Sequence, residues 1–172
     1  MTSDGCVREA LVGDVQVLRI EGSVRYTIAP VVERFLDRVF AHSAIAAVLI
    51  DLSGATYLDS TMLGVVARIV ARLRAVHGSR PTIVCPQRDL RTLLYSMGFD
   101  EVFEIVAQAP PPVVNAAHPV ATDGAPTPPS RELARTVLEA HRTLAAMNPH
   151  NEAEFHDVVA MMEREVEPDD GA

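Results

Sequence analysis

The sequence lacks the residue patterns of several common kinds of site. Its two cysteines, Cys6 and Cys85, show no spacing typical of a metal or redox centre. We therefore expect no metal ion and no cofactor, and we interpret Cys85 as a small buried residue. The longest apolar run, residues 44–50, is far too short to span a bilayer, and no signal peptide is evident. These absences predict a cytoplasmic protein without membrane insertion.

Two function classes also lack support. The formal net charge is -8, and all fifteen basic residues are arginine; binding to nucleic acid requires clustered cations, so no nucleic-acid partner is expected. No Gly-x-Ser-x-Gly elbow or glycine-rich phosphate loop is present, and the chain is predicted not to be an enzyme. One group of arginines is interpreted as a solvated helix face, with a patch for an acidic partner as the alternative. This group contains Arg68, Arg72, Arg74 and Arg80.

The histidines of the C-terminal region do not form a metal motif. His150 and His156 are six residues apart, which does not place them together on one helix face. We interpret these two and His141 as solvent-facing residues of amphipathic helices.

The order of apolar patterns predicts an α/β fold. Residues 1–106 are expected to form one domain, a small mixed sheet of about five strands with interleaved helices. Only the first two strands are joined by a hairpin, at Gly13-Asp14. The strands are expected at 7–12, 15–20, 46–50 (closed by a turn at 51–54), 82–85 and 102–106, and the helices from Pro30, from the 59–64 motif to about residue 78, and over 87–97 up to Gly98.

The most informative segment is the hexapeptide of residues 59–64, Asp-Ser-Thr-Met-Leu-Gly. It joins a buried strand to an amphipathic helix, so either Asp59 or Ser60 is expected to cap that helix. A hydroxyl in the first turn lies where the helix dipole and free N–H groups favour a phosphate. Phosphorylation there would add a strongly hydrated anion beside apolar residues and would oppose docking of a partner.

Four segments make the chain resemble the STAS domain of sulfate transporters and anti-sigma factor antagonists, over roughly residues 7–106. They are 48–53, 57–64, 93–99 and 102–103. In bacterial antagonists the family motif is Asp-Ser-Ser/Thr-Gly-Leu-Gly, and its first hydroxyl is phosphorylated. The resemblance implies that Ser60 is the phosphoacceptor. Met62 stands where the family usually has glycine; there it either enlarges the apolar surface and hinders a kinase, or packs against the adjacent turn.

The resemblance also implies which residues contact a partner protein. The loop at 23–28 lies near the phosphorylation site in the family, which makes Arg25 and Tyr26 candidates. The remaining candidates come from the motif itself: Asp59, Thr61, Met62, Leu63 and Gly64.

The function implied is that of a phosphorylation-controlled anti-sigma factor antagonist. Such a protein binds an anti-sigma factor that is itself a serine/threonine kinase, is inactivated when the kinase phosphorylates it, and is restored by a serine phosphatase. The alternative is a cytosolic STAS subunit of a membrane-associated complex of the lipid-transport type, acting as a protein–protein interaction module.

The composition changes after Val106. Residues 107–129 contain seven prolines and one charged residue, which predicts an extended, mobile linker. Residues 130–168 then predict two amphipathic helices, with Asn148 capping the second and Pro149 at its first position. Such a small hairpin is not expected to be stable alone. Three surfaces could cover its apolar stripes: the STAS domain, a second copy in a homodimer, or another protein.

Overall fold

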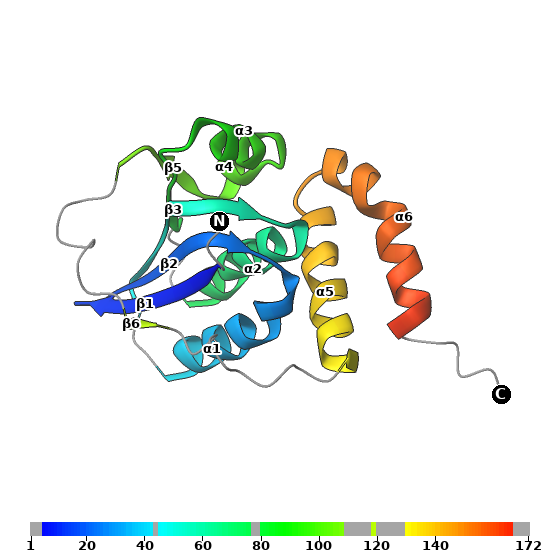
Figure 1. Cartoon of the computed structure of the whole chain (residues 1–172), viewed down its shortest axis with the longest axis horizontal. Helices are drawn as coiled ribbons and strands as arrows, with labels where there is room; N and C mark the ends of the chain where they lie inside the picture. Colours follow the sequence, from blue (N-terminus) through cyan, green and yellow to red (C-terminus); the bar gives the residue numbers. More distant parts are fainter. Residues whose placement is uncertain (1–4, 43–44, 77–79, 109–117, 120–129, 167–172) are drawn as a thin grey trace.

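In the computed structural model a six-stranded mixed sheet is covered on one face by helices (Figure 1). The structure describes residues 5–42, 45–76, 80–108, 118–119 and 130–166. The strand order is β5-β4-β3-β2-β1-β6. Strands β2 to β5 are parallel, and β1 is antiparallel to both of its neighbours. The predicted α/β class and interleaved helices are confirmed.

The chain enters the sheet through the expected hairpin. Strand β1 (Cys6–Val12) pairs with β2 (Val15–Val24), and Gly13 adopts a φ of 64° in the turn between them. Glycine takes this left-handed conformation without the steric cost that a side chain would bring.

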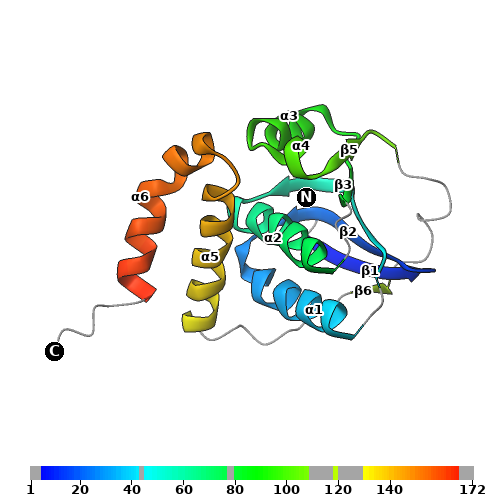
Figure 2. The same cartoon turned by 180° about the vertical axis from the view of Figure 1, so that it is seen from behind.

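All crossovers run in the same direction across the sheet. Helix α1 (Ala29–His42) connects β2 to β3, and α2 (Ser60–Val76) connects β3 to β4. Because parallel crossovers are right-handed, successive steps in one direction place their helices on the same face. Figure 2 shows α1 and α2 side by side in front of the sheet.

Strand β3 (Ala47–Leu58) is much longer than predicted. The expected turn at residues 51–54 lies inside it. The Asp51 carboxylate accepts hydrogen bonds from Arg19 and from the Ser53 N–H, both at 2.9 Å. The amide of Gln87 donates to the carbonyls of residues 52, 53 and 55. Except for the Ser53 N–H, the donors come from distant parts of the chain, so the local turn composition alone did not determine the outcome.

The end of the predicted domain also differs in detail. Strand β4 (Thr82–Val84) leads to α3 (Arg88–Ser96), and Gly98 ends that helix with a φ of 74°. A short helix, α4 (Phe99–Val102), comes before β5 (Glu104–Val106), where the sequence predicted a strand from residue 102. The ring of Phe99 stacks on that of Phe103 at a centroid distance of 5.4 Å, which holds this turn against the core.

One part of the predicted linker belongs to the sheet. His118–Pro119 forms β6 and pairs antiparallel with Arg8 and Glu9 of β1, where an unattached chain was expected. Apart from residues 107 and 108, the rest of the predicted linker lies outside the described residues.

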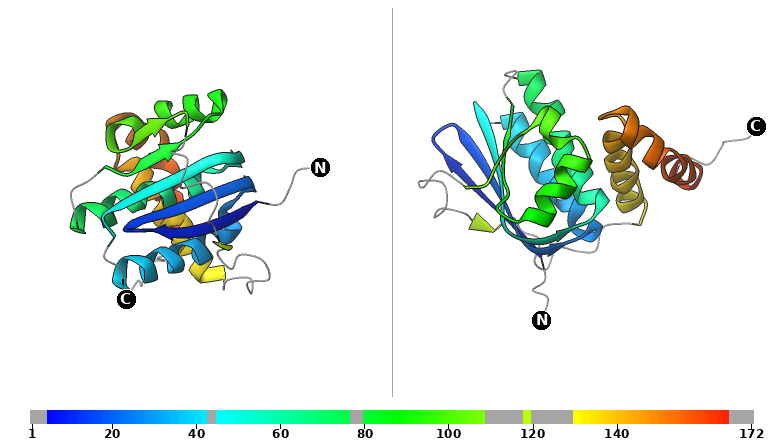
Figure 3. Two further views of the ribbon diagram at one scale, coloured as in Figure 1. Left: turned by 90° about the vertical axis from the view of Figure 1, so that its left-hand side faces the viewer. Right: turned by 90° about the horizontal axis from the view of Figure 1, so that it is seen from above.

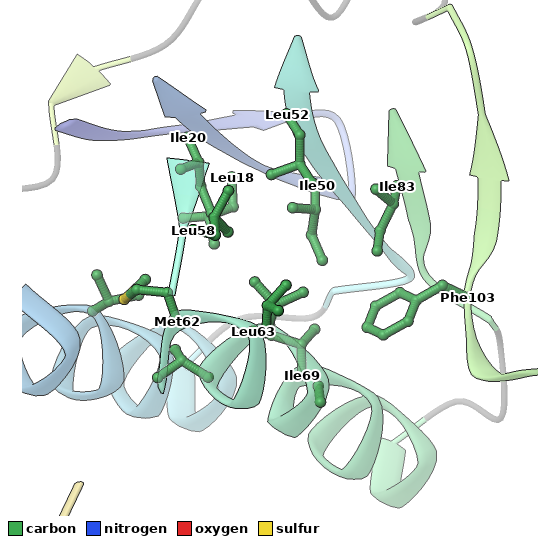
Figure 4. Packing of buried hydrophobic residues seen from close by; sticks show 14 of the residues in the cluster. Leu18, Ile20, Ile50, Leu52, Leu58, Met62, Leu63, Ile69, Ile83 and Phe103 are labelled. Atoms are coloured by element: carbon green, nitrogen blue, oxygen red, sulfur yellow. The ribbon is translucent and has the colours of Figure 1, made fainter. Parts of the chain in front are cut away.

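The main core lies between the sheet and α1 and α2 (Figure 4). Met62 and Leu63 enter it from the first turn of α2, on the side of that helix that faces Ile50 and Leu58 of β3. Cys85 is also fully buried, as predicted, and burial raises the pKa of its thiol.

Two of the arginines predicted to form a solvated face are engaged inside the domain. Arg72 contacts Glu33 at 2.6 Å and Asp37 at 2.5 Å, and Arg68 lies 3.3 Å from Glu33. Burial alone would lower the pKa of Arg72, but hydrogen bonds and charge from Glu33 and Asp37 raise it overall. These arginines join α1 to α2 and are not a patch offered to an acidic partner.

The two C-terminal helices form the predicted hairpin. Helix α5 (Ser130–Ala145) is followed by α6 (Pro149–Val166), and the Asn148 side chain caps α6 through a 2.9 Å hydrogen bond from the Asn151 N–H. Of the three surfaces considered, it is the α/β domain of the same chain that covers the hairpin. Figure 3 shows α5 lying between that domain and α6.

Candidate functional site

Asp59, and not Ser60, caps the helix of the 59–64 motif. Its Oδ1 accepts a hydrogen bond from the Met62 N–H at 2.9 Å, and its main-chain carbonyl accepts one from the Leu63 N–H at 3.0 Å. Ser60 is the first helical residue. The hydroxyl therefore lies at the positive end of the α2 dipole, where negative charge is stabilised.

The same carboxylate fixes the neighbouring loop. Its Oδ2 accepts a hydrogen bond at 2.6 Å from the N–H of Tyr26, the first residue of the short 3-10 helix η1 (Tyr26–Ile28). Arg25 and Tyr26 are exposed beside the motif, so the expected proximity of this loop to Ser60 is found. Tyr57 was not among the residues predicted to contact a partner. It is half-exposed beside this loop, with the Arg25 guanidinium 5.6 Å from its ring centroid.

Three motif residues predicted to contact a partner are buried in the structure. Met62 is completely buried, and Leu63 is 2% exposed within the same core cluster. Thr61 is buried as well. Of the two roles considered for Met62, an apolar surface beside the hydroxyl is wrong, because the side chain fills the space between α2 and the sheet (Figure 4).

Ser60 is partly buried by the chain's own C-terminal region. Its Oγ lies 2.9 Å from Nε2 of His141, a residue of α5. The other ring nitrogen, Nδ1, lies 2.8 Å from the Val137 carbonyl oxygen. A carbonyl can only accept, so Nδ1 carries the hydrogen in the neutral ring and Nε2 accepts one from the Ser60 hydroxyl.

His141 was predicted to face solvent, and this is wrong. It is 5% exposed, and its ring packs edge-on against Phe155 of α6 at a centroid distance of 5.7 Å. A signal was present in the sequence: His141 lies four residues after Val137 and three before Leu144, within the apolar stripe of its helix. His150 and His156 are exposed, as expected.

Gly64 marks the closest approach of the two helices. A Cβ built on Gly64 would lie 2.7 Å from the Ala140 Cα, and closer still to the Ala140 carbonyl. Ala140 is completely buried. Glycine is unfavourable inside a helix by about 1 kcal/mol relative to alanine. The close packing of α5 on α2 gives a physical reason for its presence here.

The chemistry available at this site is that of a modifiable hydroxyl. Ser60 has a helix N-terminus behind it and a histidine beside it, but the second histidine nitrogen is held by a main-chain carbonyl instead of a carboxylate. Among the described residues no group of three or more histidine, cysteine, aspartate or glutamate side chains could hold a metal ion. No described helix combines the length and the apolar character needed to cross a membrane.

Comparison with known proteins agrees with this architecture. A family model described as STAS domain matches residues 10–109. No curated protein sequence matches the chain.

Three similar solved structures share the fold at low identity. The anti-sigma factor antagonist SpoIIAA in its unphosphorylated form is 15% identical with a TM-score of 0.51, covering 60% of this chain and 89% of that one. An anti-sigma factor antagonist from Mycobacterium paratuberculosis is 22% identical with a TM-score of 0.52, covering 63% and 92%. The phosphorylated form of the Bacillus cell fate determinant SpoIIAA is 16% identical with a TM-score of 0.50, covering 59% and 92%.

Proposed function

Because the chain belongs to the STAS-domain family, we propose that it is an anti-sigma factor antagonist controlled by phosphorylation of Ser60. The observation that carries this proposal is the position of Ser60. It is the first residue of α2, follows the capping Asp59, and directs its hydroxyl away from the sheet toward α5. The similarity to an antagonist solved in both unphosphorylated and phosphorylated forms supports the same role.

The partner in this proposal is an anti-sigma factor with serine kinase activity. The unmodified protein binds it and frees a sigma factor, and phosphorylation of Ser60 ends that binding. A phosphoryl group adds about 1.5 to 2 negative charges at neutral pH. The group is strongly hydrated and lies next to the acidic Asp59, so a partner covering Ser60 has to desolvate it or dissociate. A serine phosphatase restores the binding form, and the chain itself supplies no catalytic step.

Phosphoryl transfer to purified protein tests the assignment. Each candidate anti-sigma serine kinase from the source organism is incubated with radiolabelled ATP and with wild type, Ser60→Ala or Ser53→Ala. Ser53 is an exposed serine of β3 and serves as the matched control. We expect label on wild type and on Ser53→Ala, but not on Ser60→Ala. Equal label on all three proteins would remove Ser60 from the proposal.

A binding measurement separates the switch from a constitutive interaction module. The kinase is captured on immobilised wild type, on Ser60→Asp and on protein phosphorylated at Ser60. Loss of capture by the phosphorylated form supports the switch, and Ser60→Asp is expected to weaken capture less because an aspartate carries less charge. Equal capture by all three forms would instead support the module reading, in which partners bind without regard to phosphorylation.

A further inference from the structure

The surface around Ser60 is occupied by helices of the same chain. Ala140 lies against Gly64 with no room for a single added carbon, and His141 is hydrogen-bonded to Ser60. Leu144, one turn further along α5, is completely buried within the core cluster of the STAS domain. Helix α5 therefore fills the face of α2 on which the proposed function requires a kinase to act.

The hairpin is attached to the domain at both ends of α5. Near the start of α5, Glu132 forms an ion pair with Arg34 of α1. At the turn between α5 and α6, the Asn151 side chain donates to the Met97 carbonyl at 2.9 Å and to the Leu144 carbonyl at 3.1 Å. Asn151 is completely buried. The hairpin thus packs on the domain in one defined position, fixed by polar contacts at both ends of α5 and by close packing between them.

Helix α6 reinforces this arrangement from outside. Arg142 of α5 forms an ion pair with Glu163 of α6 at 2.8 Å. Hydrogen bonds to Glu163 and to Glu139 raise the pKa of Arg142. Phe155 of α6 packs against the ring of His141. The residue that holds the Ser60 hydroxyl is therefore positioned by both helices.

We propose that the α5–α6 hairpin is an intramolecular inhibitor that occupies the partner-binding face of the STAS domain and shields Ser60. This inference rests on the proposed function. A protein that contacts the first two turns of α2 requires the space held by Ala140 and His141. Docking of the hairpin and docking of the kinase are consequently mutually exclusive, and the protein responds to its partner from an open state in which α5 has left α2.

The opening can be measured without a partner by the reactivity of a thiol at position 60. In full-length protein carrying Cys6→Ser and Ser60→Cys, alkylation by iodoacetamide is followed by mass spectrometry. The remaining native thiol, Cys85, is fully buried and reports unfolding of the STAS domain through a second added mass. The first-label rate then measures exposure of position 60 in the folded protein.

Two substitutions in α5 are expected to open the hairpin while leaving every residue of the STAS domain in place. Ala140→Leu inserts volume at the closest helix contact, and Leu144→Glu places a charge in the same interface. Ala153→Leu is the matched control, since Ala153 is an exposed alanine of α6. We expect labelling at least ten times faster in both interface variants and unchanged in the control, with the second label still slow. Equal first-label rates in all four proteins would overturn the inference.

The same α5 variants, with Ser60 intact, connect opening to the proposed function. The initial rate of phosphorylation by the kinase is expected to rise at least tenfold in Ala140→Leu and Leu144→Glu relative to wild type and Ala153→Leu. If opening is seen by alkylation but every protein is phosphorylated on Ser60 at the same rate, the inhibitory role is refuted. If no protein is phosphorylated on Ser60, the proposed function fails while the thiol result still describes the hairpin.

Discussion

Substitution of Gly64 by alanine should stabilise the STAS domain and, at the same time, weaken docking of the α5–α6 hairpin onto it. Within α2 the substitution is favourable, because alanine exceeds glycine in helix propensity by about 1 kcal/mol. That gain is present whether the hairpin is docked or open, so it stabilises the STAS domain without affecting the docking equilibrium. The new methyl group, however, meets the main chain of α5.

The size of the docking loss follows from the distances. The added Cβ would lie 2.7 Å from the Ala140 Cα, whereas ordinary contact begins at 3.4 Å, so α5 must retreat by at least 0.7 Å. A gap of this size forfeits a quarter to a half of the dispersion contact. Applied to fully buried Leu144, this costs about 1 kcal/mol, and disruption of the Ser60–His141 hydrogen bond costs about 1 kcal/mol more. The total of about 2 kcal/mol corresponds to about a 30-fold increase in the open population.

Hydrogen exchange measured by mass spectrometry separates the two effects. In full-length Gly64→Ala, the amides of α5 and α6 are expected to exchange about 30-fold faster, while those of β3 and β4 remain as protected as in wild type or more so. Gly54→Ala is a control outside the helix interface, since the three atoms nearest to its Cβ would all belong to Glu21 of β2, the closest being the side-chain Cγ at 3.0 Å. Protection of α5 and α6 at the wild-type level in Gly64→Ala would refute the claim that these helices are seated on Gly64.

Three other measurements test the core and its buried charges. Met62→Ala should lower the free energy of unfolding by about 2 to 5 kcal/mol, measured by denaturant unfolding. Met161→Ala, at a half-exposed position of α6, should change that free energy by less than about 0.5 kcal/mol. Similar values for the two variants would place Met62 outside the core. Asp51→Ala should cost about 3 kcal/mol because it removes the carboxylate that accepts hydrogen bonds from Arg19 and the β3 main chain, and a loss below about 1 kcal/mol would contradict the role given to it. The pKa of Cys85 is raised by burial, so less thiolate is present at pH 8 and its alkylation should be slow until denaturant unfolds the domain; fast labelling of native protein would contradict its burial.

The order of elements could be predicted because it depends on local patterns. The hairpin at Gly13-Asp14, the helix that starts beside Pro30 and the Asn148-Pro149 junction all follow from turn and capping chemistry within a few residues. The position of Ser60 at the start of α2 follows in the same way. These features required no knowledge of what packs against them.

The features that could not be predicted depend on distant partners. Ser53-Gly54 has the composition of a turn, yet the Gln87 side chain and pairing with β2 keep it within β3. The roles considered for Met62 came from comparing the motif with the family pattern, whereas its burial depends on how α2 packs in the core. His141 lay in an apolar stripe, but its role depended on which surface that stripe would cover.

Strand β6 changes the length of the tether that carries the hairpin. Were the chain first released from the sheet at Val106, twenty-three residues would separate it from α5; anchoring at Pro119 leaves only residues 120–129. Connections this short give local concentrations on the order of millimolar. An external protein with the same intrinsic affinity, present at micromolar level, therefore competes at a disadvantage of about a thousandfold. The cellular abundance of the partner, as well as its affinity, then sets the threshold at which the chain responds.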